Sequence, residues 1–320
     1  MKKAIVLFAL LSFVVSCAPT TSSRYREGSN IDQQVGLTVQ DEQRLTQEAL
    51  PQMQKEYPSA KNQDLQNYIS NLGMKIVRAN NLEGNPYHYN FTVVDVENVN
   101  AFALPAGTIF VTAPLIAMTS NEAELAGVIG HEVGHVVARH AAERMYAMEK
   151  EQNKTWLMAA GGGLLGAAAG FGLGKLLCKD GDNACLAKAA LIGAAAGAGG
   201  GLLIQKFKFM ANSREDEMEA DRIGFKLAVG AGYDKDQVGK FYEKLLDMEK
   251  KSKQGGDSIT KSLADAMSTH PPSEERVQQM KEMAAAAPAT RNPLVSSAEY
   301  TRVKKIAAAL RPNKGTKEPK

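Results

Sequence analysis

Hydrophobic residues in the first third of the chain recur first at helical and then at strand spacing. Between residues 41 and 79 they lie three or four positions apart, which predicts two helices separated at Pro58-Ser59. The stripe on the second helix comprises Leu65, Ile69, Leu72, Ile76 and Val77. Residues 87–96 and 108–112 are rich in β-forming side chains, so each is predicted to contain a strand. Between them, residues 100–105 should be extended and end at a Pro-Ala-Gly turn.

Helical spacing returns near residue 120 and dominates the rest of the chain. A helix should begin near Asn121, which is a suitable N-cap followed by acidic residues, and run through His140 toward Lys150. Further helices are predicted at about 213–229, ended by Gly230, at 234–250, and from Ser273 onward. Residues 291–320 are predicted to be a weakly structured basic tail. The pattern predicts an α+β fold that is mainly helical, with a small sheet beside the helix that begins near Asn121.

Residues 156–204 are rich in Ala and Gly and stand apart from the other predicted helices. Glycines recur every four residues in two runs, at Gly162, Gly166, Gly170 and Gly174, and at Gly193, Gly197 and Gly201. Small residues on one side of a helix allow a second helix to approach closely, so the spacing favours an inserted glycine-zipper helical hairpin. The alternative is a flexible Ala/Gly insertion. Each arm has mostly small side chains, so insertion into a bilayer is compatible with the sequence but is not required by it.

The N-terminus is typical of a lipoprotein signal. Lys2 and Lys3 precede an apolar run, residues 4–15, that is followed by Ser16 and Cys17. We interpret residues 1–16 as a signal peptide, Cys17 as the lipidated residue and residues 17–40 as a polar tether. Ala18 favours the outer membrane of a Gram-negative envelope, facing the periplasm. The alternative is an ordinary signal peptide in which Cys17 has no special role.

Composition limits the classes of function. A net charge of +3 with 44% hydrophobic residues suits a globular protein, and there is no nucleic-acid-binding motif. Cys178 and Cys185 remain besides Cys17, and an exported compartment allows them to form a disulfide. The alternative is two free thiols, and the exported compartment favours the disulfide.

The sequence His131-Glu132-Val133-Gly134-His135 carries the chemistry. Residues four apart share one face of a helix, so His131 and His135 can present nitrogens to one metal ion. Glu132 can reach a water on that ion and act as a general base. The pattern predicts a zinc site with one Zn²⁺ per chain.

A catalytic zinc usually has three protein ligands, so a third must come from elsewhere. His140 is rotated off the face of His135, and His88 lies in a strand-like segment, so structural roles are favoured for both. Glu217 and Asp221 lie four apart on a predicted helix, and one could bind zinc while the other orients a ligand histidine. The alternative is a solvated acidic helix face, which would suit Glu215, Asp216 and Glu219.

Several motifs together resemble the HtpX and CAAX-prenyl-protease-like zinc metallopeptidases, in particular a periplasmic, lipid-anchored branch. These are the motif at 131–135 with its flanks, Glu217-x-x-Ala-Asp221, the segment 100–107, and Thr269-His270-Pro271 with Arg276. The resemblance implies a zincin-like domain over residues 41–290. It implies His131, His135 and Glu217 as ligands, Glu132 as base and Asp221 as partner of a ligand histidine.

Two further features lead to hypotheses about substrate. The segment comprising Asn100, Ala101, Phe102 and Ala103 resembles an edge strand that pairs with an extended substrate, and Arg276 is expected to contribute to that binding. His270 could occupy the open zinc position in a resting state, donate to the tetrahedral intermediate, or be a buried structural histidine.

The sequence therefore predicts an endopeptidase that cleaves unfolded or misassembled envelope polypeptides, held at the membrane by its lipid, with the hairpin as a candidate second attachment. Alternatives are a non-proteolytic assembly factor with a residual site, and an integral-membrane protease using the hairpin as two spans.

Overall fold

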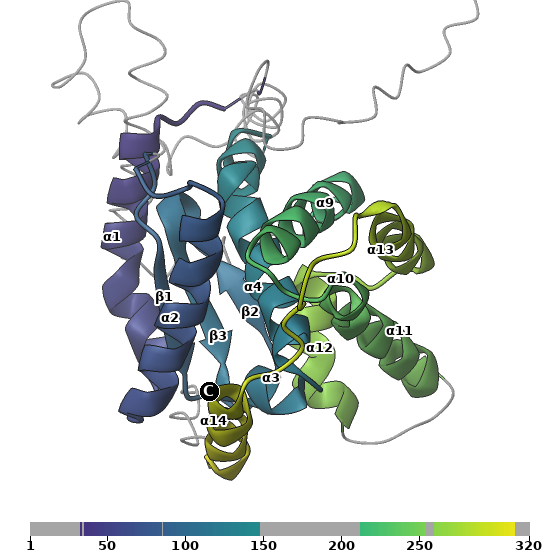
Figure 1. Ribbon diagram of the computed structural model, residues 1–320. Helices are drawn as coiled ribbons and strands as arrows, with labels where there is room; N and C mark the ends of the chain where they lie inside the picture. The colour runs from purple at the N-terminus through teal and green to yellow at the C-terminus, as the bar shows by residue number, and fades with distance from the viewer. Residues whose placement is uncertain (1–32, 34, 85, 148–211, 254–258, 311–320) are drawn as a thin grey trace, which may run out of the picture.

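The computed structural model describes residue 33 and residues 35–84, 86–147, 212–253 and 259–310 (Figure 1). The predictions for the signal peptide, Cys17, the glycine-zipper hairpin and the pair Cys178 and Cys185 concern residues outside this part of the chain. None of the helices among the described residues combines the length and hydrophobicity needed to cross a bilayer.

A three-stranded sheet lies between helices of the N-terminal half. The elements are α1 Val39–Glu56, α2 Gln63–Ala79, β1 Asn90–Val94, β2 Ala101–Ala103, the 3-10 turn η1 Pro105–Gly107, β3 Thr108–Thr112 and α3 Ala113–Met118. The strand order is β1-β3-β2, with β1 parallel and β2 antiparallel to β3. β2 is therefore at an edge of the sheet.

Alternation along β3 gives the sheet two buried faces. Ile109 and Val111 point into the main core with α2 and α4, whereas Phe110 points into a second cluster with Leu45 and Met53 of α1. Burying both faces fixes the register, because a shift by one residue would exchange the two sets of side chains.

The remaining elements are helices, some of which pack directly on α4, Glu122–Val137. They are α9 Arg214–Gly230, α10 Lys235–Val238, α11 Lys240–Lys253, α12 Ile259–Thr269, α13 Glu274–Ala286 and α14 Ala298–Ala309. Figure 1 shows α4 in the middle of the molecule, with α1, α2 and the sheet on one side and α9 to α13 on the other. The fold is mainly helical with a small sheet, as the sequence predicts.

The predicted extent of the α4 helix is wrong at its C-terminal end. The helix stops at Val137 because Arg139 adopts a left-handed conformation with φ 56°. Its guanidinium bonds to the buried carboxylate of Glu42 and, at 2.7 Å, to the carbonyl of Leu37. The tertiary pairing thus holds a backbone conformation that local sequence disfavours. Residues 140–147 then form a separate helical segment.

The predicted weakly structured tail is also wrong over α14. Tyr300 and Val303 of this helix are buried against the core. The Tyr300 hydroxyl bonds to the Thr119 carbonyl at 2.9 Å, and the carboxylate of Glu122 accepts the Ser297 amide at 2.8 Å. The folded region also begins slightly earlier than predicted, since Leu37 is buried and α1 starts at Val39.

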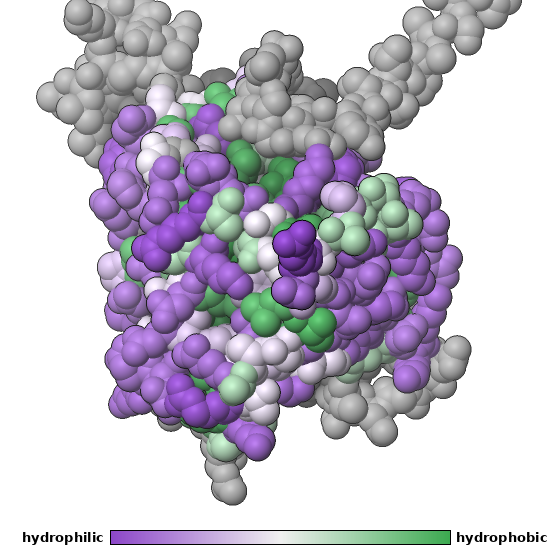
Figure 2. Space-filling view, viewed as in Figure 1, coloured by the Kyte–Doolittle hydropathy of each residue, from purple (hydrophilic) through white to green (hydrophobic). Residues whose placement is uncertain are grey.

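The surface facing the viewer in Figure 2 is largely hydrophilic.

Candidate metal centre and active site

The backbones of α4 and α9 are in direct contact, and this contact positions the site. A Cβ on Gly224 would lie 2.5 Å from the backbone nitrogen of His131, and one on Gly130 would lie 2.6 Å from the Gly224 carbonyl oxygen. Only residues without a side chain permit such an approach. It brings the His131 and His135 face of α4 against the Glu217 face of α9.

Four donor groups converge at this contact. His131, His135, Glu217 and His270 each offer one atom, and these atoms all lie within 4.8 Å of one another. Nε2 of His131 is 3.0 Å from Nε2 of His135 and 3.2 Å from Nδ1 of His270. The Glu217 carboxylate is 3.2 Å from Nε2 of His135 and 3.0 Å from Nδ1 of His270. The structure thus brings together the three predicted ligands and His270.

These spacings and donor types fit a tetrahedral zinc ion. Bonds of about 2.0–2.1 Å in a tetrahedron place the donors about 3.3–3.4 Å apart. The separations here are 3.0–3.4 Å, and imidazole and carboxylate are ligands that zinc prefers. The residues present therefore fit the ion that the sequence motif predicts.

Asp221 and Arg276 support His131 from behind. Nδ1 of His131 lies 2.8 Å from Oδ1 of Asp221. Each oxygen of the Asp221 carboxylate accepts one bond of 2.7 Å from the Arg276 guanidinium, Oδ2 from Nε and Oδ1 from Nη2. With Asp221 ionised, the His131 proton is held on Nδ1 and the lone pair of Nε2 faces the cluster. Burial raises the pKa of Asp221, but Arg276 and then His131 outweigh burial and lower it.

The predicted role of Arg276 in substrate binding is wrong. Its side chain is only 2% exposed, and its Nη1 lies 2.8 Å from Glu217 in addition to the two bonds to Asp221. The guanidinium also stacks on the Tyr242 ring. Arg276 is therefore committed to neutralising the two buried acids.

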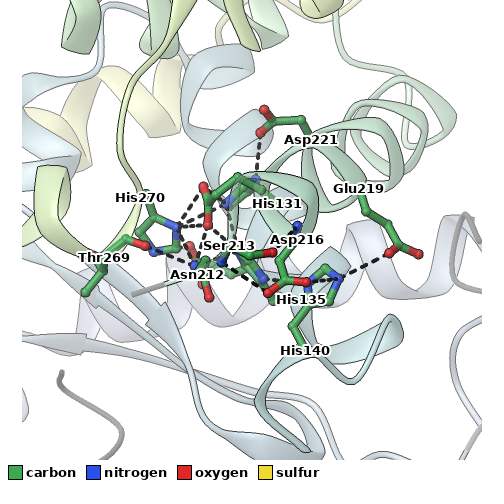
Figure 3. Close-up of polar contacts among 12 residues, drawn as sticks. His131, His135, His140, Asn212, Ser213, Asp216, Glu219, Asp221, Thr269 and His270 are labelled. Atoms are coloured by element: carbon green, nitrogen blue, oxygen red, sulfur yellow. Dashed lines mark hydrogen bonds and ion pairs between the residues drawn. The ribbon is translucent and has the colours of Figure 1, made fainter. Parts of the chain in front are cut away.

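His140 and Glu219 support His135 in the same way. Nδ1 of His135 is 2.8 Å from Nδ1 of His140, whose Nε2 faces Glu219 at 3.4 Å (Figure 3). If Glu219 accepts from His140, then His140 accepts from His135 and Nε2 of His135 is free for the metal. The alternative prediction of a solvated acidic face is wrong for Asp216 and Glu219, which are buried. Arg144 and His140, which lie outside α9, face these acids.

Charges within the cluster set its protonation before any ion binds. Burial raises the pKa of Glu217, but His270, Arg276 and His131 outweigh it and hold the pKa well below the usual range. Burial lowers the pKa of His135 far below its ordinary value, and His131 adds to this effect. An anionic carboxylate and a neutral imidazole are the forms that bind metal. Burial lowers the pKa of His131, but Glu217 and Asp221 outweigh burial and raise it to about 10, so His131 would release a proton when the ion binds.

Glu132 lies at the mouth of the cluster, next to the edge strand. Its carboxylate is 3.5 Å from Nε2 of His270 and accepts a bond from the backbone of Ala103. Burial raises the pKa of Glu132, and the nearby His270 and His131 only partly oppose this. A carboxylate with a raised pKa is suited to accept a proton near neutral pH.

A cavity of about 120 Å³ adjoins Glu132. Its walls come from α1, β2, the C-terminal part of α4 and the His270 loop. Phe102 and Ala103 line it and are partly exposed, whereas Asn100 and Ala101 are largely buried. Of the predicted substrate-binding residues, Phe102 and Ala103 are thus the accessible pair.

Sequence reasoning missed Asn212, which lies directly beside the donors. Its Nδ2 is 3.1 Å from the Thr269 carbonyl and 3.3 Å from Nε2 of His135, and it also bonds to Glu217 (Figure 3). Its position next to Ser213, the N-cap of α9, was the available signal, because a residue beside the cap lies one turn from Glu217. His88 is exposed and lies before β1, which begins at Asn90, so it is not a residue of the strand.

Two histidines one turn apart with an intervening glutamate define the H-E-x-x-H class of metallopeptidase sites. Comparison with known proteins gives the family: the sequence model of peptidase family M48 matches residues 59–284. The chain therefore belongs to peptidase family M48. Membership implies a metal cofactor, and the four-donor cluster is where this chain could hold it.

Similar proteins from bacteria and mitochondria share this region. The chain is 28% identical over 241 residues to the beta-barrel assembly-enhancing protease of Escherichia coli, covering 75% of this chain and 43% of that protein. It is 35% identical over 184 residues to the mitochondrial metalloendopeptidase OMA1 of Arabidopsis thaliana, covering 58% of this chain and 29% of that protein. The chain thus spans less than half the length of these relatives. They confirm the family but do not support the HtpX or CAAX-prenyl-protease branch specifically.

Proposed function

We propose that this chain is a zinc-dependent endopeptidase, with one Zn²⁺ per chain, that cleaves unfolded or misassembled polypeptides. The observation that carries the proposal is the cluster of His131, His135 and Glu217 with Glu132 beside it. Metal donors and a candidate base share one buried site that opens to a cavity lined by the edge strand β2.

Different residues of the chain would bind the metal, orient its ligands and act as the general base. Nε2 of His131, Nε2 of His135 and the Glu217 carboxylate would hold the ion, and Asp221 and His140 would orient the two histidines. When bound, zinc would polarise the scissile carbonyl and make a bound water more acidic. The Glu132 carboxylate would accept a proton from the attacking water and pass it to the leaving amine.

Substrate would lie along β2. An edge strand offers unpaired backbone groups to an extended peptide. In β2 the accessible residues that line the cavity are Phe102 and Ala103. Such pairing requires the substrate backbone to be free, so it favours unfolded chains over folded ones.

His270 would keep the resting site closed. Its Nδ1 takes a place among the donors, 3.0 Å from Glu217, while its ring stands between the cluster and the Glu132 carboxylate. This arrangement favours the role of an occupant of the open position over that of a donor to the intermediate. Movement of the loop after α12 would then be needed to admit substrate.

The proposed setting is the bacterial cell envelope, with quality control of envelope proteins as the role. A bacterial relative is named for beta-barrel assembly, and the signal-like N-terminus with Cys17 supports export and a lipid anchor in the outer membrane, facing the periplasm. The full activity, substrates and partners are part of the proposal.

The deciding experiment combines metal analysis with proteolysis for the wild type and Glu132→Gln. We expect both proteins to hold one zinc, and cleavage of casein to fall by about 10²-fold or more in the variant, because general-base catalysis contributes about 10²–10⁴-fold. Equal cleavage by the two proteins would contradict the assignment of Glu132. No zinc-dependent cleavage by either would favour an assembly factor with a residual site.

A further inference from the structure

One cation in the wall of the catalytic cavity is poorly paired. Arg144, in the helical segment after α4, lines the same cavity as Glu132 and His135. Its Nε and Nη1 are buried, and neither has a hydrogen-bond partner in the part of the chain that the structure describes. A buried guanidinium normally has its fork of N–H donors matched by acceptors.

Among the described residues, the acid that Arg144 faces does not satisfy these donors. Asp216 Oδ2 is 3.9 Å from Nη1 of Arg144, which is too far for a hydrogen bond. The same oxygen accepts the backbone amide of Ser213 at 3.2 Å as part of the cap of α9. Asp216 therefore lowers the cost of burying the charge without satisfying the guanidinium. Burial lowers the pKa of Arg144 against the opposing effect of Asp216, Glu217 and Glu132.

Arg139, the other arginine in the cavity wall, has acceptors for its guanidinium donors. Arg139 bonds through Nε and Nη2 to the carboxylate of Glu42, and its Nη2 also reaches the Leu37 carbonyl. Its charge is matched within the fold. Of the two arginines in the cavity wall, Arg144 is thus the one with N–H donors that no described residue pairs.

We propose that Arg144 binds a carboxylate of the substrate and sets the specificity of cleavage. This inference rests on the proposed peptidase function. The complementary ligand for a guanidinium with unpaired N–H donors is a carboxylate, because N–H bonds between two charged groups are among the strongest hydrogen bonds in proteins. Because Glu132 and Arg144 line one cavity, the carboxylate would belong to a residue close to the scissile bond. Its source would be either an acidic side chain or the free C-terminus of the polypeptide.

The test uses peptides in which only this carboxylate changes. A cleavage site mapped in casein would be remade as fluorogenic peptides that carry Glu or Gln at each position around the bond. A second set would place a C-terminal acid or amide one to three residues beyond it. We expect the zinc-loaded wild type to prefer one carboxylate peptide over its amide by about tenfold or more in kcat/KM, the scale of a hydrogen bond to a charged group.

Variants of Arg144 test whether this residue causes the preference for the carboxylate peptide. Arg144→Gln should remove it while still cleaving the amide peptide, and Arg144→Lys should keep only part, because an ammonium lacks the planar fork. Arg302→Gln is the matched control: it removes one positive charge on α14 from an exposed pair with Asp64 of α2. It should leave the preference intact. Thermal unfolding of each variant checks that it is folded.

Peptide binding to zinc-loaded Glu132→Gln separates the two proposals. Cleavage without any preference between acid and amide would overturn the carboxylate site and leave the peptidase standing. A preference that survives in Arg144→Gln would overturn the assignment of Arg144. Binding that discriminates through Arg144 without cleavage by the wild type would keep the site and remove the peptidase. Neither binding nor cleavage would overturn both.

Discussion

The candidate metal centre has one half built on helices and one half built on loops. His131, His135 and Glu217 project from α4 and α9, whose backbones touch, and each is at most 7% exposed. His270 and Asn212 come from the ends of segments, after α12 and before α9, and the His270 side chain is 13% exposed. Figure 3 shows His270, Asn212 and Thr269 on the same side of the cluster.

The difference lies in what holds each donor. His131 and His135 each have a buried partner behind the ring, and those partners bond to charged groups in turn. For His270, the ring contacts found among the described residues are with groups of the site itself: the other donors, Asn212 and Glu132. A donor held only by the site can leave when the site is occupied by something else. The helical half is therefore the scaffold and His270 the exchangeable part.

The largest effect is expected from breaking the helical half at Asp221. In Asp221→Asn the Arg276 charge loses its bidentate partner in a buried position, which should lower the free energy of unfolding by about 3–5 kcal/mol. Zinc affinity should fall by about 10–100-fold, because the neutral amide oxygen of Asn is a weaker acceptor for the His131 proton than the carboxylate is. Chemical denaturation and competition with a zinc-binding dye measure the two quantities.

Asp64→Asn is the control for this change. It breaks an Asp–Arg pair of the same chemistry in which both side chains are 52% exposed, so it should cost at most about 1 kcal/mol. Equal losses in the two variants would contradict the view that Asp221 is a buried anchor.

A smaller effect is expected from separating the two helices. Gly224→Ala places a methyl group 2.5–2.7 Å from backbone atoms of His131 and Gly130, so α4 and α9 must move apart. Overpacking of this kind costs about 1–3 kcal/mol, and Glu217 would shift away from the histidines. Bound zinc per chain and thermal stability should both decrease. The control is Lys226→Ala, at an exposed position of α9, which should change neither bound zinc nor thermal stability. Preserved zinc binding in Gly224→Ala would show that the close contact of the two helices is not needed.

The smallest effect on the scaffold is expected from removing the loop donor. His270→Ala should retain zinc, since His131, His135 and Glu217 remain, and should leave stability nearly unchanged. Cleavage of an unstructured substrate should rise, by about tenfold if the closed arrangement is populated about nine times in ten. Initial rates on casein with matched zinc loading measure this. A fall in activity would contradict the closed-site role and favour a catalytic donor.

The helix-borne half could be predicted from the sequence because its spacing is local. Residues 131 and 135, and 217 and 221, lie one helical turn apart, so periodicity alone places each pair on one face. The family resemblance then ordered Glu217 and Asp221. The loop-borne half resisted prediction, since nothing local says that Asn212 reaches Thr269 across 57 positions.

Tertiary pairing also explains the errors in the fold. Helix propensity continues past Val137, but the bonds of Arg139 to Glu42 and Leu37 impose a left-handed residue there. Glu219 and Asp216 are residue types typical of a surface, yet they are buried and face His140 and Arg144 from another part of the chain. Arg276 matched the motif correctly, but a motif does not show which way a side chain faces.

The N-terminal segment meets the catalytic domain beside its working cavity, and this sets a geometric limit. Nε2 of Gln33 bonds to the Ala138 carbonyl at 2.6 Å, so the chain joins the domain at the C-terminal end of the active-site helix. If Cys17 carries the proposed lipid, a chain of the length from Cys17 to Asp32 can reach at most roughly 55 Å, at about 3.3–3.6 Å per residue. The active site could then reach only substrates close to the membrane. A substrate's distance from the bilayer would matter as much as its sequence.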